Sequence, residues 1–135
     1  MENNINKRYK SFTSLEQSKK LAKILPIESA DLYYYKYGLP HFIEGQEDYE
    51  SIRTDKYRDK IPCWSLAALL NVLPKEIETG GQRYAPCLFP VQDKWLLRLW
   101  YNSNYIITSP ISIFSDNPID ACVAMIEKLH KLKIL

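Results

Sequence analysis

Apolar residues recur at helical spacing in three segments of the chain, and each segment has the end signals of a helix. The first follows Thr13 and Glu16, which match a capping box, and stops at Pro26, because the residue before a proline is disfavoured in a helix. In the second, Pro62 takes a first-turn position, where its missing N–H is not needed. In the third, Asn117 or the residue before it is the N-cap. The pattern therefore predicts three helices, over residues 13–25, 63–73 and 118–132.

Five further segments are rich in aromatic and β-branched residues and are bounded by turn residues, as is typical of strands. They cover residues 31–37, 83–89, 94–101, 105–109 and 111–114. The segment 94–101 is the strongest of them, whereas Pro86 weakens its predecessor and indicates an edge strand or a bulge. Helices and strands do not alternate regularly, so the expected fold class is α+β. We expect an antiparallel sheet of four to five strands with about three helices packed mainly on one face.

A chain of 135 residues fits one domain, and the prediction is a single domain over residues 1–135. Residues 1–12 are polar and are predicted to be flexible. Residues 39–60 are polar, mixed in charge and without a period, and they are predicted to form a long polar loop. Loops of that length are uncommon inside a compact domain, so this one is functional, flexible or contains a short element. The sequence leaves open whether it forms a lid.

The net charge of +2 is too small to favour nucleic acid as a partner. Basic residues are concentrated near the N-terminus, where Lys19, Lys20 and Lys23 lie outside the apolar stripe of the first helix. We interpret them as a solvated helix face, with contact to an anionic partner as the alternative. The polar N-terminus does not resemble a signal peptide, and no apolar segment approaches the roughly 20 residues of a membrane span. We therefore expect a cytoplasmic protein with no membrane partner.

Few patterns in the sequence point to catalysis or to metal binding. Cys63, Cys87 and Cys122 are odd in number and widely spaced, which argues against a disulfide framework or a zinc site and favours buried thiols. His41 would act with a cysteine, or the acids of residues 44–50 with one another, only if the fold brought them together. Gly80 and its neighbour belong to no phosphate-binding motif and are interpreted as a turn. We expect neither a cofactor nor a metal, and an enzyme is disfavoured but open.

The strand over residues 94–101 carries the best candidate for a binding site. On a strand, alternate residues share a face, so Lys94, Arg98 and Trp100 lie on one side. An arginine beside a tryptophan can stack on a planar ring and also hold a phosphate or a carboxylate. Tyr34, from the tyrosine-rich first strand, and Arg83 are predicted to extend this surface. The alternative is an arginine that snorkels across a half-exposed sheet, or a dimer contact.

Three segments of the chain combine helix caps, prolines and apolar stripes, namely Ser14–Pro26, Pro62–Leu70 and Asp116–Cys122. Together these segments resemble a group of small proteins encoded by phages and integrated elements of gut Bacteroidales bacteria. Such features transfer no catalytic residue, and the group has no established activity. The resemblance implies a phage accessory protein of the non-enzymatic kind, which binds a host protein or sequesters a small signalling molecule used in antiviral defence.

The sequence leaves three hypotheses for the function, and the third is the least favoured. The leading hypothesis is a binding protein that sequesters a small anionic, nucleotide-type signal, or one that binds a host protein. The alternative is a protein–protein interaction module or homo-oligomer that uses an aromatic sheet face. A small hydrolase built on His41 or on the loop acids is the third.

Overall fold

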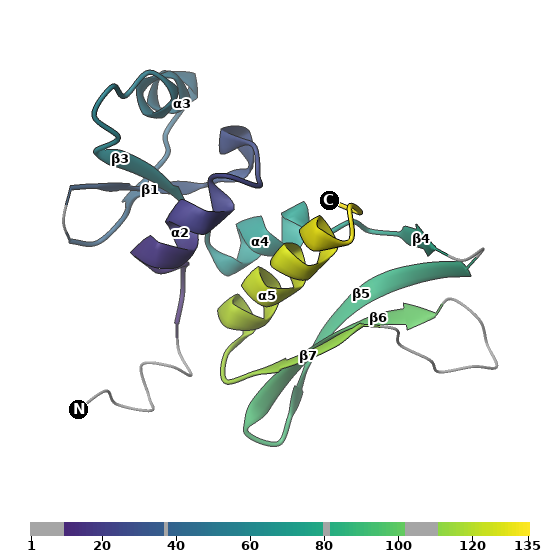
Figure 1. Ribbon diagram of the computed structural model, residues 1–135. Helices are drawn as coiled ribbons and strands as arrows, with labels where there is room; N and C mark the ends of the chain where they lie inside the picture. Colours follow the sequence, from purple (N-terminus) through teal and green to yellow (C-terminus); the bar gives the residue numbers. More distant parts are fainter. Residues whose placement is uncertain (1–9, 37, 80–81, 102–110) are drawn as a thin grey trace. The chain divides into compact units, whose positions relative to one another are not determined.

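The computed structural model describes residues 10–36, 38–79, 82–101 and 111–135, without the side chains of residues 78, 79, 82 and 99–101. Contacts divide the chain into two compact units (Figure 1). The N-terminal unit is Ser11–Val72, and the C-terminal unit is Leu73–Leu135 together with Met1–Lys10. That the whole chain is one domain stays a prediction, and the predicted flexibility of residues 1–12 falls mostly outside the described residues.

The N-terminal unit contains a three-stranded antiparallel sheet in the order β2-β1-β3 (Figure 1). Its strands are β1 (Leu32–Tyr35), β2 (His41–Phe42) and β3 (Lys60–Cys63). Its helices are α2 (Leu15–Leu21), the 3₁₀ turn η1 (Ile27–Ser29), α3 (Gln46–Arg53) and α4 (Leu66–Val72). Residues 39–60 therefore contain a short strand and a helix, which is the third of the alternatives that the sequence left open.

Helix α2 begins one residue later than its sequence predicts. Ser14 is the N-cap, and it exchanges a capping box with Gln17 in place of Thr13 with Glu16. Thr13 is fully buried instead. Its hydroxyl lies 2.7 Å from that of Ser18 and accepts from the backbone N–H of Trp64 at 3.1 Å. A hydroxyl with buried partners is satisfied without capping, so tertiary contacts shifted the cap to the next serine.

The prediction of a helix from residue 63 is wrong at its start. Pro62 lies in strand β3 opposite Tyr33, where an edge position needs no donor from proline. The helix α4 begins only at Leu66. Ser65 caps it by accepting from the N–H of Ala68 at 3.3 Å, and Asp31 accepts from the N–H of Ser65 at 2.9 Å. Proline is compatible with both a first helical turn and an edge strand, and pairing with β1 selects the strand here.

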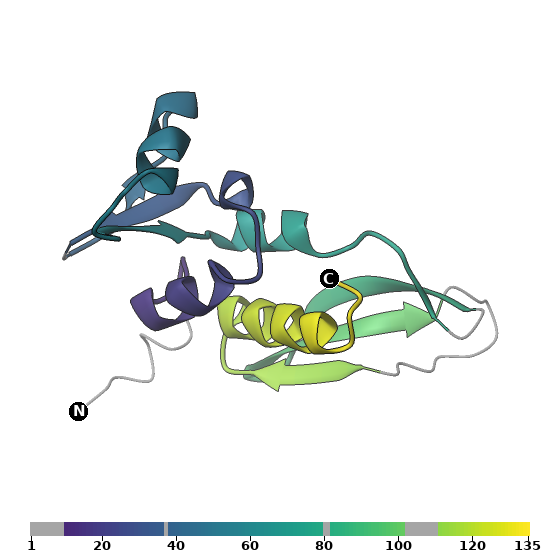
Figure 2. The ribbon, with the colours of Figure 1, turned by 45° about the horizontal axis from the view of Figure 1, so that its top comes forward.

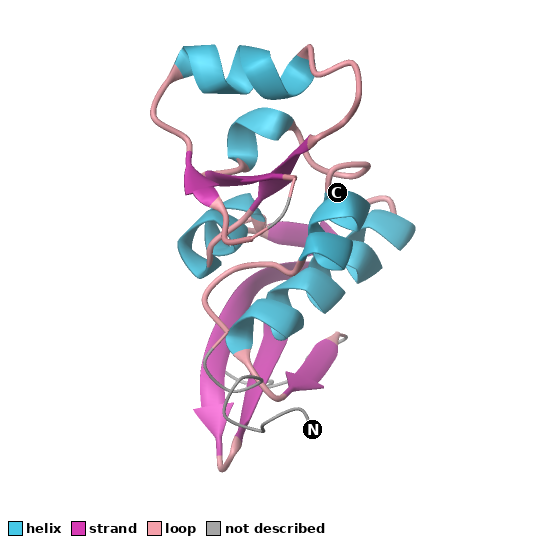
Figure 3. Cartoon of the chain, turned by 90° about the vertical axis from the view of Figure 1, so that its left-hand side faces the viewer, coloured by secondary structure: helices cyan, strands magenta, loops and turns pink. Residues whose placement is uncertain are grey.

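The C-terminal unit contains a four-stranded antiparallel sheet in the order β4-β5-β6-β7, with α5 packed against β6 and β7 (Figures 2 and 3). The elements are β4 (Ile77–Thr79), β5 (Gln82–Val91), β6 (Lys94–Tyr101), β7 (Ser112–Ser115) and α5 (Pro118–Lys131). Among the described residues, β4 pairs with residues 82–84 alone, so no described strand lies on that side of Pro86, which agrees with the edge position indicated by the sequence. Asn117 caps α5 by accepting from the N–H of Asp120 at 2.8 Å.

The α+β class is confirmed, but the strands form two sheets of three and four strands rather than one of four to five. The described residues include four α-helices, one more than expected, because α3 is polar. The predicted strand over residues 105–109 lies outside the described residues. Each unit has its own buried side chains, among them Leu21, Trp64 and Leu69 in the first and Leu97, Cys122 and Ile126 in the second. No helix among the described residues is long and apolar enough to cross a membrane.

Candidate functional site

The face of the four-stranded sheet that carries Arg98 is the site predicted from the sequence. In the strand register, Arg98 lies opposite Cys87 on β5 and Ser112 on β7. Two residues away, Leu96 lies opposite Phe89 and Phe114. Opposite residues share a face, so this side of the sheet presents an apolar centre, and we call Phe89, Leu96, Arg98 and Phe114 the aromatic face.

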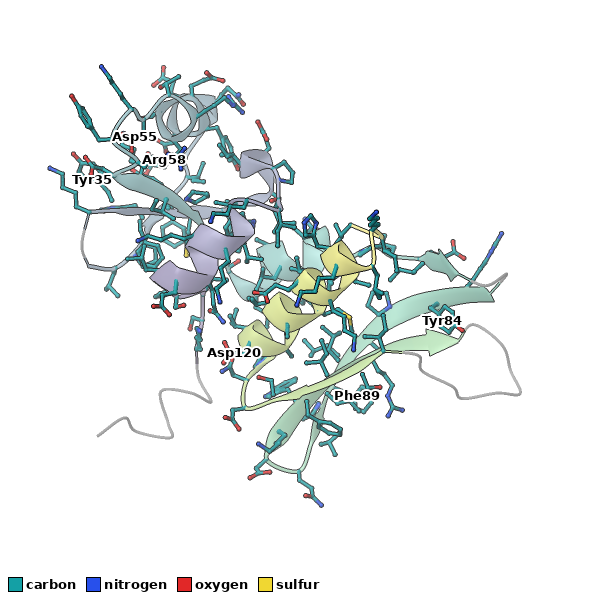
Figure 4. The ribbon with its side chains drawn as sticks, in the orientation of Figure 1. Tyr35, Asp55, Arg58, Tyr84, Phe89 and Asp120 are labelled. Carbon is teal, nitrogen blue, oxygen red and sulfur yellow. The ribbon has the colours of Figure 1, made fainter. Side chains whose placement is uncertain are left out.

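The aromatic face is open beside Phe114 and closed over Leu96. Phe114 is 61% exposed, whereas Leu96, between Phe89 and Phe114 in the register, is 3% exposed. The guanidinium carbon of Arg98 lies 5.8 Å from the ring centroid of Phe89, which is labelled in Figure 4. Arg98 therefore makes a cation–π contact with its own sheet, and part of its charge is directed to that ring.

The other cations predicted for this site do not gather around Arg98. Arg83 and Lys94 share its side of the sheet by alternation, but Arg83 is near the start of β5 and Lys94, on β6, pairs with Val91 at the other end of β5, about 26 Å away along the strand. Arg83 is 3.5 Å from Glu76. Lys94 is 2.8 Å from Asp116, and that hydrogen bond raises the pKa of the lysine ammonium. Trp100 is opposite Ala85 in the register, and its side chain lies outside the described residues.

Tyr34 does not belong to the aromatic face, so that part of the prediction is wrong. It lies on β1 in the three-stranded sheet of the N-terminal unit and is 8% exposed. Its hydroxyl donates to the carbonyl of Thr13 at 2.7 Å, and burial raises its pKa. Tyr34 packs with Leu32 and Cys63, so both its ring and its hydroxyl have partners inside the N-terminal unit.

A pocket of about 680 Å³ in the N-terminal unit was not predicted from the sequence. Its wall comes from α2 and the turn that follows it, from η1, from α3 and its following turn, and from β3. We call this the basic pocket, and its lining residues are Lys19, Ala22, Lys23, Ile27, Ile52, Arg53, Asp55, Arg58, Lys60, Ile61 and Pro62. Five of them are cationic and only Asp55 is acidic, so the pocket has a strong positive balance.

Two of the five cations already have partners. Arg53 makes ion pairs with Glu28 and with Glu50, all of them at the surface. The ammonium of Lys60 donates to the hydroxyl of Ser51. These contacts hold α3 against its neighbours, because they join that helix to η1 and to β3.

The other three cations, Lys19, Lys23 and Arg58, are without a carboxylate within 4.0 Å among the residues that the structure describes. Lys19 and Lys23 are four residues apart, which places both side chains on one side of α2 and its final turn. Arg58 lines the pocket from the turn after α3, near Asp55 and Tyr35 (Figure 4). Like charges that converge without counterions form a site that favours an anion.

The turn over residues 55–58 shapes one rim of the basic pocket. The N–H of Arg58 donates to the carbonyl of Asp55 at 3.3 Å, and the Asp55 carboxylate accepts from the N–H of Lys60 at 2.5 Å. Arg58 has φ 55°, the left-handed region that side chains other than glycine and asparagine rarely adopt. Asp55 is thus committed to the turn, and the turn holds Arg58 in a conformation that costs free energy.

The other residues considered for chemistry have structural positions. His41 is exposed on β2 and its ring lies 5.4 Å from that of Tyr33. Burial raises the pKa of the Cys63 thiol and raises that of Cys122 to about 12, so both are poor nucleophiles. Asp48 accepts from the N–H of Glu44 at 2.8 Å and lies in the first turn of α3. Among the described residues, no three histidine, cysteine, aspartate or glutamate side chains gather as metal ligands would.

The sequence contained one signal for the basic pocket, the lysines of the first helix, which we interpreted as a solvated face. No pattern in the sequence pointed to Arg53, Arg58 and Lys60, because the segment that contains them was expected to be a polar loop. No family model, curated protein or solved structure matches the chain.

Proposed function

We propose that the protein binds a small anionic ligand in the basic pocket. The observation that carries the proposal is the convergence of five cationic side chains on one pocket, three of which have no carboxylate partner among the described residues. An anion that enters the pocket gains charge-assisted hydrogen bonds with Lys19, Lys23 and Arg58 without breaking an existing ion pair. The pocket volume falls within the range of about 300–1,000 Å³ that small-molecule sites occupy.

The lining residues favour binding over turnover. Asp55 is the one carboxylate among them, and it accepts a backbone hydrogen bond from Lys60. A hydrolytic site would need a nucleophile and a base within hydrogen-bond reach of each other. The described lining residues offer no such pair, so sequestration of a ligand fits them better than catalysis does.

The biological setting of the proposal comes from the resemblance alone. As an accessory protein of a phage, a binder of this kind would lower the free concentration of a nucleotide-type signal in the host cell. A host protein as the partner remains the other form of this hypothesis. The chemistry of the basic pocket supports the small anion.

The proposal is tested by titrating the full chain with inorganic pyrophosphate in a calorimeter. We expect Lys19→Gln/Lys23→Gln to weaken binding about tenfold or more, because each charged hydrogen bond contributes about 1.5–3 kcal/mol. Lys20→Gln is the matched control, since Lys20 is exposed on the same helix and does not line the pocket. Equal losses in the control and the double variant, or no binding by the wild type, would contradict the proposal.

The aromatic face supports a second candidate function, self-association of the chain. Phe114 is 61% exposed and shares the face with Phe89 across Leu96, and antiparallel sheets pack face to face through such apolar centres. A second copy would cover the ring of Phe114 on both subunits. Sedimentation of the wild type at high concentration tests this directly. A monomer there, unchanged by Phe114→Ser, would exclude the aromatic face as a homo-oligomer interface.

A further inference from the structure

One wall of the basic pocket is the outer edge of strand β3. Lys60, Ile61 and Pro62 are consecutive in that strand, and all three line the pocket. Successive residues of a strand point to opposite faces of its sheet, so a space that touches all three lies along an edge. The inner edge pairs with β1, and the sheet order β2-β1-β3 places no further strand on the outer edge among the described residues. The pocket therefore opens on backbone groups as well as on cations.

The strand register determines which backbone groups of β3 face the pocket. The N–H of Lys36 donates to the carbonyl of Asp59 at 3.1 Å, which makes these two residues a hydrogen-bonded pair of the antiparallel ladder. Such pairs alternate along a ladder with pairs whose N–H and C=O groups point away from the partner strand. Two residues further along, Ile61 bonds to β1, whereas Lys60 and Pro62 direct their backbone groups outward.

Contacts at both ends of the outer edge agree with this assignment. The outward N–H of Lys60 donates to the Asp55 carboxylate at 2.5 Å. At the other end, the carbonyl of Trp64 accepts from the N–H of Thr13 at 2.9 Å, and the Trp64 N–H donates to the Thr13 hydroxyl at 3.1 Å. Pro62, between these ends, has no N–H. The edge beside the pocket thus offers two carbonyls, and its described N–H groups are already bonded.

The carbonyls of Lys60 and Pro62 have no hydrogen-bond donor among the residues that the structure describes. Pro62 is buried, so water has little access to its carbonyl. Nearly all buried carbonyls in native proteins have a partner, and one without a partner costs free energy comparable to a lost hydrogen bond. A bound ligand with donor groups would supply that partner. This observation is independent of the cations that carry the proposed function.

We propose that the anion bound by the basic pocket is a phosphorylated polyol, such as a sugar phosphate. Its phosphate lies against the cations Lys19, Lys23 and Arg58. Its hydroxyl groups donate to the outward carbonyls of Lys60 and Pro62. The inference rests on the proposed function and adds the chemistry of the uncharged part of the ligand. Hydroxyl groups suit an edge that only accepts, because each donates one proton and can turn its lone pairs toward water or a lysine.

A peptide strand fits the same edge less well. A strand that adds to a sheet presents both an N–H and a C=O at every second residue. The carbonyls of such a strand would meet no free backbone donor, because the Lys60 N–H is bonded to Asp55 and Pro62 has none. Proline on a sheet edge is one of the features that discourage strand pairing. A small hydroxylated anion is therefore the ligand that we assign.

The experiment compares phosphomonoesters that differ in their hydroxyl groups. The full chain is titrated calorimetrically with glucose 6-phosphate against cyclohexylmethyl phosphate, and with glycerol 3-phosphate against propyl phosphate. We expect at least one hydroxylated ligand to bind about fivefold or more tightly than its counterpart, because it makes two further hydrogen bonds. Lys19→Gln/Lys23→Gln should weaken both members of a pair by the same factor, since these lysines contact the phosphate. Lys20→Gln should weaken neither.

Carbon-13 chemical shifts test whether the two carbonyls accept the hydroxyl groups. In isotopically labelled protein, the carbonyl of Lys60 is observed through the N–H of Ile61, and that of Pro62 through the N–H of Cys63. Both carbonyl resonances should move downfield when the tighter polyol phosphate is added and should stay in place with its hydroxyl-free counterpart. The carbonyl of Cys63, observed through Trp64, faces β1 and is the matched control.

The outcomes separate this inference from the proposed function. Hydroxyl-free phosphates that bind as tightly as both polyol phosphates, or failure of either carbonyl resonance to move, would overturn the polyol assignment and leave the anion pocket intact. Failure of every phosphate compound to bind, pyrophosphate included, would overturn both. Tighter binding of a hexapeptide of alternating glutamate and valine, with both carbonyl resonances shifted, would replace the polyol by an added strand.

Discussion

The basic pocket and the aromatic face use the same kinds of residue in different geometry. Both combine cations with apolar side chains. On the aromatic face, the strand register spreads Arg83, Arg98 and Lys94 along one sheet, and the two outer cations each have a carboxylate within 4.0 Å. In the basic pocket, residues from four separate segments line one space, and only Arg53 among the five cations is within that distance of a carboxylate of the described chain.

The difference shows why convergence matters more than composition for an anion site. Charges separated by more than a Debye length, about 8 Å at physiological ionic strength, are largely screened from one another. Cations spread along a strand therefore act singly. Cations around a cleft act on the same ligand, and the low-dielectric wall strengthens their field. If convergence governs binding, substitutions in the basic pocket reduce anion affinity and substitutions on the aromatic face leave it nearly unchanged.

The largest effect is expected from reversing two charges in each region. Lys19→Glu/Lys23→Glu should weaken pyrophosphate binding about 100-fold or more, because two attractive contacts become repulsive. Arg83→Glu/Lys94→Glu changes the net charge of the protein by the same amount on the aromatic side of the sheet. Its affinity should change less than about threefold. Similar losses in both double variants would mean that net charge, not the pocket, governs binding in the calorimeter.

Chemical modification of Cys87 offers a second contrast, because this thiol lies opposite Arg98. Cys87 is half-buried, whereas Cys63 and Cys122 are fully buried, so N-ethylmaleimide should modify Cys87 first in the native protein. Burial raises the pKa of the Cys87 thiol, which lowers its thiolate fraction at neutral pH. The rate should therefore rise about tenfold per pH unit and continue to rise above the usual thiol pKa of about 8.5.

Mass spectrometry identifies the modified cysteine, and calorimetry then measures anion binding by the modified protein. Affinity within about twofold of the unmodified protein is expected. Loss of binding on modification would place the ligand on the aromatic face after all.

A smaller effect is expected at Arg58, where side chain and backbone act in opposite directions. Arg58→Gly removes one cation of the pocket and also the left-handed strain at φ 55°. We expect anion affinity to fall several-fold while the free energy of unfolding rises by about 0.5–1 kcal/mol. Urea unfolding of Arg58→Gly and of Arg58→Gln separates the two contributions, because only the glycine relieves the backbone. A loss of stability in Arg58→Gly would show that the arginine side chain supports the fold.

The smallest effects are expected from single substitutions on the aromatic face. Arg98→Ala and Phe114→Ser should each change pyrophosphate affinity less than twofold. Phe114 is largely exposed, so Phe114→Ser should alter the free energy of unfolding by no more than about 0.5 kcal/mol. A tenfold loss of affinity in Arg98→Ala would restore the site that the sequence predicts.

Prediction from the sequence was most accurate for elements whose structure depends on interactions between near neighbours in the chain. Strand β6 has the bounds predicted for it, Lys94–Tyr101, and helix α5 begins at Pro118 behind its Asn117 cap. In both, alternation or capping acts between near neighbours in the chain. The helix α3 was missed because it is polar and presents only Ile52 as a buried residue, which leaves almost no apolar period to detect.

Candidate site residues were harder to predict because a site joins distant segments. Alternation along one strand places Lys94 and Arg98 on the same side, as predicted, whereas Arg83 shares that side only through the register of β5 with β6. The sequence could not exclude Tyr34, because alternation does not say which strand pairs with which. The lysines of α2 could be recognised in the sequence as a basic cluster. Whether they line the same pocket as Arg58 depends on how α2, α3 and β3 pack.

By itself, the sequence determined the α+β class, the caps and ends of several elements, and the alternation that assigns faces to each strand. These depend on interactions within a few residues. Only the tertiary structure decided that the strands form two sheets, that Pro62 joins a strand, and that five cations share one pocket. Those outcomes depend on pairing and packing between segments up to about forty residues apart, such as Lys19 and Lys60, where side-chain contacts rather than local propensity select the arrangement.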